Sequence, residues 1–293
     1  MVKLAREDIR TTEVLDWKGL HLIHFMGSSC SQKTRIALAE KGVEWESHHC
    51  DIGANENFTP WFMGINPRGL VPILVHDGDV HIESNDIIEY VDETFDGDTK
   101  LFPSDPDERA EMDRLMKYED DLHLCVRALT FRYFMPVEKM RKPDEAVDIY
   151  EKEGADTVGG QEDGRKAIEV KFWRDMNANG GITDEQVIEA TDEFTKAFAM
   201  LEERLEKHEW LMPSGFSALD IAWWITVFRI TRMGFPLDRF PKLKAWHDRL
   251  LAREHFARET ALPPPVVEIS KAHQAACAAA GQSMTDVMAA HGR

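Results

Sequence analysis

A short segment of hydroxyl and thiol side chains, between a strand pattern and a helix pattern, constrains the fold of this chain most. Residues 21–26 (His-Leu-Ile-His-Phe-Met) alternate as in a strand, and residues 34–39 are helix formers. Ser28, Ser29 and Cys30 therefore lie at a predicted helix N-terminus. Free N–H groups and the helix dipole favour an anion there, including a thiolate, so we expect the chemistry at this position.

The size and charge of the chain limit its class. With 293 residues, it is long for one hydrophobic core, so one large domain or two smaller ones are expected. Hydrophobic residues at 43% and charged residues at 30% are typical of a soluble globular protein. The formal net charge of -18 would repel nucleic acids and anionic membranes, so we expect neither as a partner.

The cysteine spacing and the N-terminus predict a cytoplasmic protein. Four widely spaced cysteines, Cys30, Cys50, Cys125 and Cys277, form neither a CxxC motif nor a zinc-ligand spacing, so reduced thiols are expected. The first residues lack the apolar stretch of a signal peptide. No apolar run approaches the roughly 20 residues that span a bilayer.

Hydrophobic patterning predicts a mixed α/β part followed by a helical part. Residues 20–96 predict the order β-α-β-α-β-β-α, with a hairpin turn at Asp77 and Gly78. Residues 1–19 are polar and are expected to form an N-terminal extension. Residues 97–106 are rich in turn formers and predict a linker.

Residues 107–265 predict an all-helical domain. Its predicted helices cover residues 107–135, 183–208, 217–233 and 241–259. The charged, glycine-containing residues 136–181 are expected to form a partly helical insertion in this domain, and residues 266–293 an alanine-rich tail.

The clearest helix start lies near residue 217. Ser217 fits the N-cap and Asp220 the third helical position of a capping box, although Asp replaces the usual Glu. The helix that follows is apolar nearly all round, which predicts a central position. We therefore assign Trp223 and Trp224 to the core rather than to a substrate site.

Several motifs in order along residues 20–260 resemble the soluble glutathione S-transferase superfamily. They are Ser-Ser-Cys-Ser at 28–31, Asn-Pro-Arg-Gly-Leu-Val-Pro at 66–72, Glu-Ser at 83–84 and the cap at 217–220. The resemblance implies a thioredoxin-like N-terminal domain followed by an all-α C-terminal helical bundle, which is an α+β/α fold.

Different segments resemble different members of this superfamily. The start of the first helix is similar to the zeta class, the maleylacetoacetate isomerases. Residues 50–60 resemble bacterial tetrachlorohydroquinone reductive dehalogenases. Residues 66–85, the extension and the insertion resemble bacterial glutathione-dependent β-etherases, which split lignin-derived aryl ethers.

The resemblance implies glutathione as cosubstrate and attack of its thiolate on an apolar aromatic electrophile. Thioether-forming cleavage of a β-aryl ether is the favoured reaction, and reductive dehalogenation and cis-trans isomerisation are neighbouring reactions. A thiol reductase that uses Cys30 as nucleophile and a non-catalytic glutathione-binding partner subunit are the alternatives. The superfamily is usually dimeric, which implies a homodimer or a heterodimer with a related subunit.

Ser28 is the first candidate for activating the glutathione thiol, with Ser29 and Cys30 also facing the sulfur. A thiol with a pKa near 8.5 is mostly protonated at neutral pH, and a hydroxyl that donates to the sulfur favours the thiolate. Alternatively, Ser28 and Ser29 only cap the helix. Cys30 either forms a mixed disulfide with glutathione or packs as an inert side chain.

The other motif residues are candidates for holding glutathione. A cis bond between Val71 and Pro72 would turn the Val71 main chain toward the cysteinyl part, although Pro72 alternatively only starts a strand. Glu83 would bind the γ-glutamyl ammonium, and the Ser84 hydroxyl with helix N–H groups its carboxylate. Arg68 either reaches the glycyl carboxylate or is a basic loop residue.

The sequence also bears on a metal site and on an acceptor pocket. His48, His49 and Cys50 follow one another on a strand and point alternately to opposite faces, so we expect no metal there. An acceptor pocket between the domains would be lined by residues whose spacing fits a helical core face equally well. These are Tyr118, Leu122, Cys125, Leu129 and Tyr133.

Overall fold

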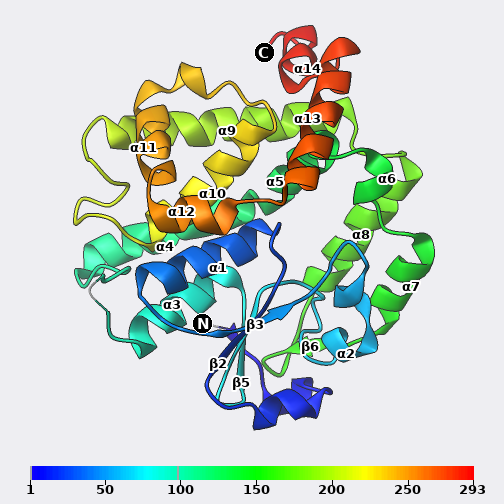
Figure 1. Ribbon diagram of the computed structural model, residues 1–293, viewed down its shortest axis with the longest axis vertical. Coiled ribbons are helices and arrows are strands. Elements are labelled where there is room, and N and C mark those ends of the chain that lie inside the picture. Colours follow the sequence, from blue (N-terminus) through cyan, green and yellow to red (C-terminus); the bar gives the residue numbers. More distant parts are fainter. Residues whose placement is uncertain (1, 98) are drawn as a thin grey trace. The chain divides into compact units, whose positions relative to one another are not determined.

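The computed structural model describes residues 2–97 and 99–293, and the chain divides into two compact units. The first unit comprises Met1–Asp98 and Arg141–Gly180, and the second Thr99–Met140 and Gly181–Arg293 (Figure 1). The first unit contains a mixed five-stranded sheet with helices, whereas the regular elements described in the second unit are all helices. The expected fold class is therefore confirmed.

The sheet of the first unit has the strand order β1-β5-β4-β2-β3. β2 runs parallel to β3 and antiparallel to β4, and Ile23 pairs with Ile73. β4 and β5 form the predicted hairpin, with positive φ at Asp77 and Gly78. The strands are β1 Val2–Lys3, β2 Leu20–His24, β3 Glu46–His49, β4 Ile73–His76 and β5 Asp79–Ile82.

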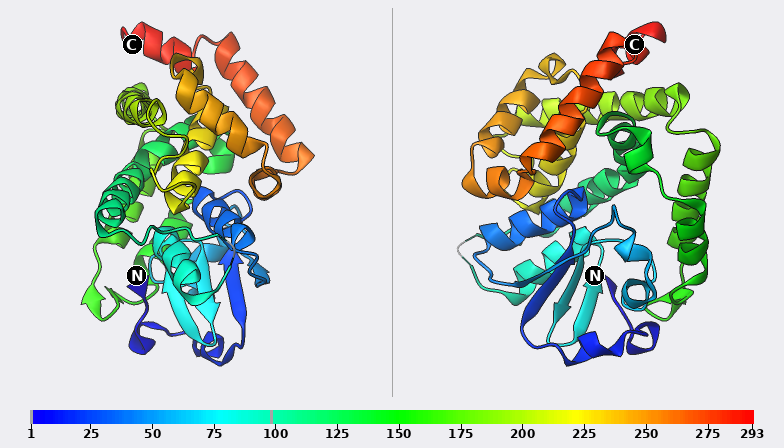
Figure 2. Two further views of the ribbon diagram at one scale, coloured as in Figure 1. Left: turned by 90° about the vertical axis from the view of Figure 1, so that its left-hand side faces the viewer. Right: turned by 45° about the vertical axis from the view of Figure 1, so that its right-hand side comes forward.

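Alternating side chains give the sheet two apolar faces. α1 (Ser29–Glu40) and α3 (Ser84–Thr94) lie side by side on one face, where Leu38 and Ile87 pack with Leu22 of β2 (Figure 1 and Figure 2). The other face packs against the N-terminal segment and against α2 (Pro60–Met63), which follows the turn η3 (Glu56–Phe58).

Residues 2–19 are an integral part of the first unit, which corrects the extension expected at 1–19. β1 pairs with β5, and the segment continues through the 3-10 turns η1 (Arg6–Asp8) and η2 (Thr12–Asp16). Leu4, Ile9 and Val14 are buried in the same core as the strands. Their five-residue spacing matches neither a helix nor a strand period. The hydrophobic pattern therefore predicts no regular element in this segment.

Residues 141–180 of the charged insertion expected at 136–181 belong to the first unit rather than to the helical domain. Tyr150 stacks on Phe58, with ring centroids 4.2 Å apart, and its hydroxyl donates to the Arg68 carbonyl at 2.7 Å. Buried Asp8 accepts from the Thr157 hydroxyl at 2.6 Å. The insertion forms α7 Asp144–Lys152, β6 Thr157–Val158, β7 Gln161–Glu162 and α8 Arg165–Ala178, and Figure 1 shows α7 and α8 side by side.

The second unit is built around α10, which contacts α4, α5 and α11. Trp223 and Trp224 of α10 are fully buried, as predicted, and their indole N–H groups donate to the carbonyls of Leu115 and His247. The helices are α4 Pro106–Asp121, α5 His123–Tyr133, α6 Val137–Met140, α9 Asp184–Leu205, α10 Ala218–Arg232, α11 Pro241–Leu251, α12 Glu254–Thr260, α13 Pro264–Ala279 and α14 Met284–Ala290. Figure 2 shows α13 and α14 in orange and red, and they pack on α5 and α9.

Two expectations for the second unit change. The single helix predicted at 107–135 is divided at Leu122 into α4 and α5. The expected linker at 97–106 includes Leu101, which is fully buried and whose carbonyl accepts from the Ala218 N–H at 2.9 Å. Residues 99–106 are therefore part of the second unit.

None of the helices in the described part of the chain has both the length and the apolarity needed to cross a membrane.

Candidate functional site

The hydroxyl and thiol segment lies where the sequence places it, at the start of α1. Ser28 is the N-cap, Ser29 the first helical residue and Cys30 the second, and all three are half-buried. The Ser28 N–H donates to the Phe25 carbonyl at 3.2 Å, which closes the turn between β2 and α1. Arg35 of α1 is buried and donates to the carbonyls of the same turn.

Ser28 caps the helix and keeps a donor. Its Oγ accepts a hydrogen bond from the Ser31 N–H at 3.3 Å, which is the helix-capping role. A serine hydroxyl also carries one O–H donor, and accepting a hydrogen bond does not use that donor. The Ser28 O–H is therefore chemically able to donate to an anion at the first turn of α1.

The positions of the four cysteines distinguish Cys30 from the other three. Burial raises the pKa of Cys50 to about 12 and that of Cys125 to about 11, and it also raises the pKa of Cys277. These three thiols therefore stay protonated at neutral pH. Cys30 is the second residue of α1, in the first turn of the helix that follows β2.

The strand register brings Val71 and Pro72 to the same end of the sheet as Ser28. Because Ile73 pairs with Ile23, the residues before Ile73 lie beside the chain that leaves β2 toward the Ser28 turn. The Val71–Pro72 bond is cis, as predicted. No described residue hydrogen bonds to the main chain of Val71, so its N–H and C=O are available to a ligand.

Glu83 and Ser84 join β5 to α3. Glu83 has φ +67, a backbone conformation that non-glycine residues rarely adopt and that occurs preferentially at functional sites. Ser84 is buried at the first position of α3. Lys33 of α1 donates to the Asn85 side chain at 2.9 Å, which fixes the start of α3 beside α1.

Arg68 has two carboxylate partners, so it is not a free basic loop residue. Its Nε and Nη2 donate to both oxygens of Asp163 at 2.9 and 2.8 Å, and its Nη1 donates to Glu83 at 2.5 Å. Burial lowers the pKa of Arg68, but the Asp163 and Glu83 carboxylates more than offset this and raise it. The guanidinium remains charged and holds the Glu83 carboxylate in place.

Sequence reasoning missed three residues that support this site. Asp163 lies after β7 in the insertion, far from Arg68 in sequence. Lys33 and Arg35 are long charged side chains on a helix face that would ordinarily be solvated, yet both are buried. The only available signal was the high polarity of α1, which conflicts with a helix packed on a sheet.

The residues suggested for an acceptor pocket belong largely to the core of the second unit. Leu122, Leu129 and Tyr133 are buried, which fits the core-face alternative. Tyr118 lies edge-on to Trp223, with ring centroids 5.6 Å apart.

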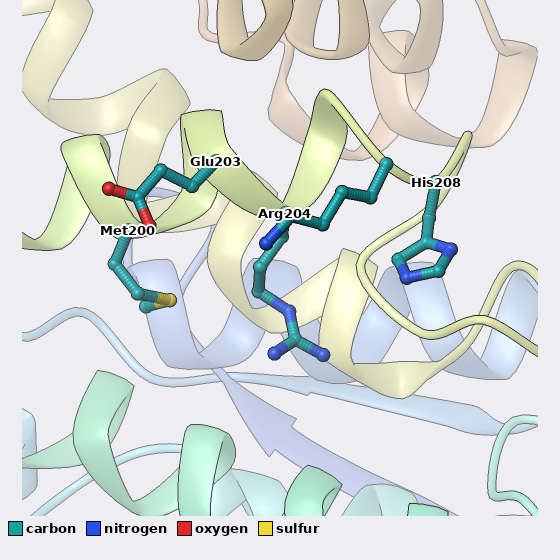
Figure 3. Close-up of a pocket in the computed structure, with 5 residues that line it drawn as sticks. Met200, Glu203, Arg204 and His208 are labelled. Carbon is teal, nitrogen blue, oxygen red and sulfur yellow. The ribbon is translucent and has the colours of Figure 1, made fainter.

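A hollow on α9 of the second unit contains none of the predicted site residues (Figure 3). Arg204 lines it, and its guanidinium is held by Glu111 at 2.7 Å and by the Leu211 carbonyl. The hollow is lined by Met200, Glu203, Arg204, Lys207 and His208.

Comparison with known proteins matches both parts of the chain. Residues 27–94 match the glutathione S-transferase N-terminal domain, and residues 173–249 match the glutathione S-transferase C-terminal domain. Protein LigF of Sphingobium sp. is 32% identical over 242 residues, which cover 80% of this chain and 90% of that protein. Glutathione S-transferase 1 of Dianthus caryophyllus is 28% identical over 256 residues, 86% of this chain and 96% of that protein.

Solved structures agree with these matches. The crystal structure of the beta-etherase LigF from Sphingobium sp. has a TM-score of 0.68 at 30% identity, over 82% of this chain and 98% of that one. Glutathione transferase F7 of Populus trichocarpa has a TM-score of 0.62 at 18% identity, over 83% of this chain and 100% of that one, which shows the fold alone. Together with the two domain matches, these similarities show that the chain belongs to the glutathione S-transferase family, whose enzymes use glutathione as cosubstrate.

Proposed function

We propose that this enzyme activates glutathione for attack on an apolar aromatic electrophile and that its reaction is thioether-forming cleavage of a lignin-type β-aryl ether. The observation that carries this proposal is the Ser28 hydroxyl, a donor at the first turn of α1 in the part of the chain that matches the glutathione S-transferase N-terminal domain. The similarity to LigF, whose crystal structure is described as that of a beta-etherase, supports the choice of electrophile.

In the proposed reaction the glutathione thiolate attacks the carbon that bears the aryloxy group. A carbon–sulfur bond forms, the carbon–oxygen bond breaks, and the aryl oxygen leaves with the bonding electron pair. The phenolate then takes up the proton that the thiol lost, so the products are a glutathionyl thioether and a phenol. Ser28 acts by stabilising the thiolate, with Ser29 and Cys30 facing the same sulfur.

Three residues are proposed to hold the rest of glutathione. The Val71 main chain beside Pro72 pairs with the cysteinyl part in the manner of an added strand. Glu83 binds the γ-glutamyl ammonium, and the Ser84 hydroxyl with the N–H groups of α3 binds its carboxylate.

Arg68 is proposed as a positioning residue for Glu83 rather than as the anchor of the glycyl carboxylate. Its hydrogen bonds to Glu83 and Asp163 use three of its five N–H donors and fix the guanidinium against these two carboxylates, which orients Glu83.

The reaction is tested by mass spectrometry of the products. The enzyme is incubated with glutathione and separate β-aryl ethers, haloarenes and disulfides. The proposal predicts a glutathionyl adduct of the ether side chain together with one equivalent of free phenol. Glutathione disulfide formed together with a dehalogenated arene, without any ether adduct, would contradict it.

A second candidate function is a glutathione-dependent thiol reductase, which the position of Cys30 in the first turn of α1 favours. A Cys30→Ser variant separates the two functions. Disulfide reduction through a Cys30 mixed disulfide would be lost, whereas ether cleavage led by Ser28 would persist. A non-catalytic partner subunit would bind glutathione and convert none of the electrophiles.

We also propose that the enzyme is cytoplasmic and dimeric. Four widely spaced cysteines suit a reducing compartment. Homodimers or heterodimers with a related subunit follow from the family resemblance. Size-exclusion chromatography with light scattering distinguishes a dimer from a monomer.

A further inference from the structure

Three side chains gather at the start of β2 and on β3, at the end of the sheet away from Ser28. In the parallel register His21 lies opposite Glu46, and His48 is two residues further along β3 on the same face. The His21 Nδ1, the His48 Nε2 and a Glu46 carboxylate oxygen all lie within 4.8 Å of one another. The two nitrogens are 3.0 Å apart, and Glu46 oxygens lie 3.5 Å from His21 and 3.7 Å from His48.

The hydrogen bond on the far side of the His21 ring selects its tautomer. His21 Nε2 lies 2.8 Å from the Lys18 carbonyl oxygen. A carbonyl only accepts, so Nε2 carries a proton, and in the neutral ring the Nδ1 lone pair points toward His48 and Glu46. A backbone carbonyl that orients a histidine in this way is the usual outer contact of a metal-binding imidazole.

We propose that His21, Glu46 and His48 form a binding site for a divalent transition metal such as Zn²⁺. Ligands at 2.0–2.1 Å from a tetrahedral zinc lie about 3.3 Å apart, close to the separations found here. Two imidazoles and one carboxylate suit zinc and its neighbours, whereas Mg²⁺ and Ca²⁺ prefer sets of oxygen ligands.

The surroundings give the site a covered side and an open side. Trp17 stacks on His48, with ring centroids 4.4 Å apart and planes 16° apart, and also contacts His21. The His21 side chain is only 8% exposed, whereas that of Glu46 is 67% exposed. A metal can therefore enter from the Glu46 side and complete its coordination with water.

The proposal is tested with Co²⁺, whose visible absorption reports its ligands, on untagged protein freed of metal by a chelator. We expect one equivalent of Co²⁺ per chain with visible bands that Zn²⁺ abolishes and Mg²⁺ does not. Glu46→Gln and His48→Gln each weaken Co²⁺ binding by about tenfold or more, because each removes one of three ligands. Glu46 is exposed, so its substitution keeps the fold, which circular dichroism checks.

His49→Gln is the matched control. His49 follows His48 on the same strand but faces the Phe25 ring, so its loss leaves Co²⁺ binding unchanged. The proposal is overturned if the unaltered protein takes up no Co²⁺, or if either Glu46→Gln or His48→Gln binds it as the unaltered protein does. Neither readout involves glutathione or an electrophile, so the result is independent of the proposed reaction.

Discussion

Burial of the His81 side chain makes the stability of the first unit depend on pH. It is 5% exposed on β5 and stacks on Tyr90, with ring centroids 3.9 Å apart. Burial and, to a lesser degree, the charge of Lys3 lower the pKa of His81 to about 4. The folded state therefore holds a neutral imidazole that the unfolded chain would protonate near pH 6.5.

We predict that this group contributes stability above about pH 6.5 that is lost as the pH falls toward 4, because the unfolded state binds the extra proton. The difference in pKa corresponds to roughly 3 kcal/mol of unfolding free energy. Urea denaturation between about pH 7 and pH 4 measures it, and a His81→Phe variant should lose this part of the acid sensitivity. His208→Gln, at an exposed position, should retain it; equal acid sensitivity in all three proteins would contradict the prediction.

At the residue scale, the sequence predicts features that depend on neighbouring residues within one motif. It does not predict contacts between residues that lie far apart in the sequence. The Ser28 cap and the cis Val71–Pro72 bond were predictable because each depends on neighbouring residues. The pairing of Arg68 with Asp163 was not, because no local pattern relates residues 95 positions apart. The sequence therefore offers Arg68 as a contact of the glycyl carboxylate or as a basic loop residue, and not as a partner of Glu83.

At the scale of elements, the start of α10 joins three parts of the second unit. The predicted capping box at Ser217 and Asp220 is present. The fully buried Asp220 carboxylate also accepts from the Leu211 N–H at 3.1 Å and the Trp246 indole at 2.9 Å. A cap that ordinarily stabilises one helix end thus also ties α11 and the loop before α10 to the core.

We predict that Asp220→Ala lowers the unfolding free energy by about 3 kcal/mol or more, because several buried donors lose their acceptor at once. The matched control is Asp286→Ala, which removes the same type of box from α14 at a half-buried position. The control should cost about 1 kcal/mol. Denaturant titrations compare the two variants, and an equal loss would refute the network role of Asp220.

The sequence predicted elements well where local signals mark their ends. The β4–β5 hairpin has a turn dipeptide, and α10 has a cap. The break at Leu122 between α4 and α5 has neither proline nor glycine, so the helical pattern ran through it. β1 is two residues long, too short to show a period.

At the scale of the whole molecule, the chain leaves the first unit after residue 98, returns to it for residues 141–180 and leaves it again. The composition predicts an insertion within the helical domain, because helix-forming and charged residues continue without any signal of a domain boundary. What decides its placement are tertiary contacts of Tyr150, Thr157 and Asp163. A single sequence does not show such contacts.

We predict that Asp163→Asn raises the KM for glutathione roughly three- to tenfold, equivalent to about 1 kcal/mol, with little change in kcat. The variant loosens Arg68 and therefore Glu83, while the start of α1 stays intact. Steady-state kinetics at varied glutathione measures the effect. Glu162→Gln, an exposed neighbour, is the control, and an unchanged KM in Asp163→Asn would exclude the positioning role of Arg68.

The most direct test of the account is the ionisation of enzyme-bound glutathione, followed by the ultraviolet absorbance of its thiolate as the pH is varied. In the unaltered enzyme the midpoint should lie below that of free glutathione. Ser28→Ala should raise it by about one to two pH units, because a hydrogen bond to a charged group is worth about 1.5–3 kcal/mol. Ser29→Ala should leave the midpoint nearly unchanged. A midpoint that is the same in Ser28→Ala, or that moves only in Cys30→Ser, would contradict thiolate stabilisation by Ser28.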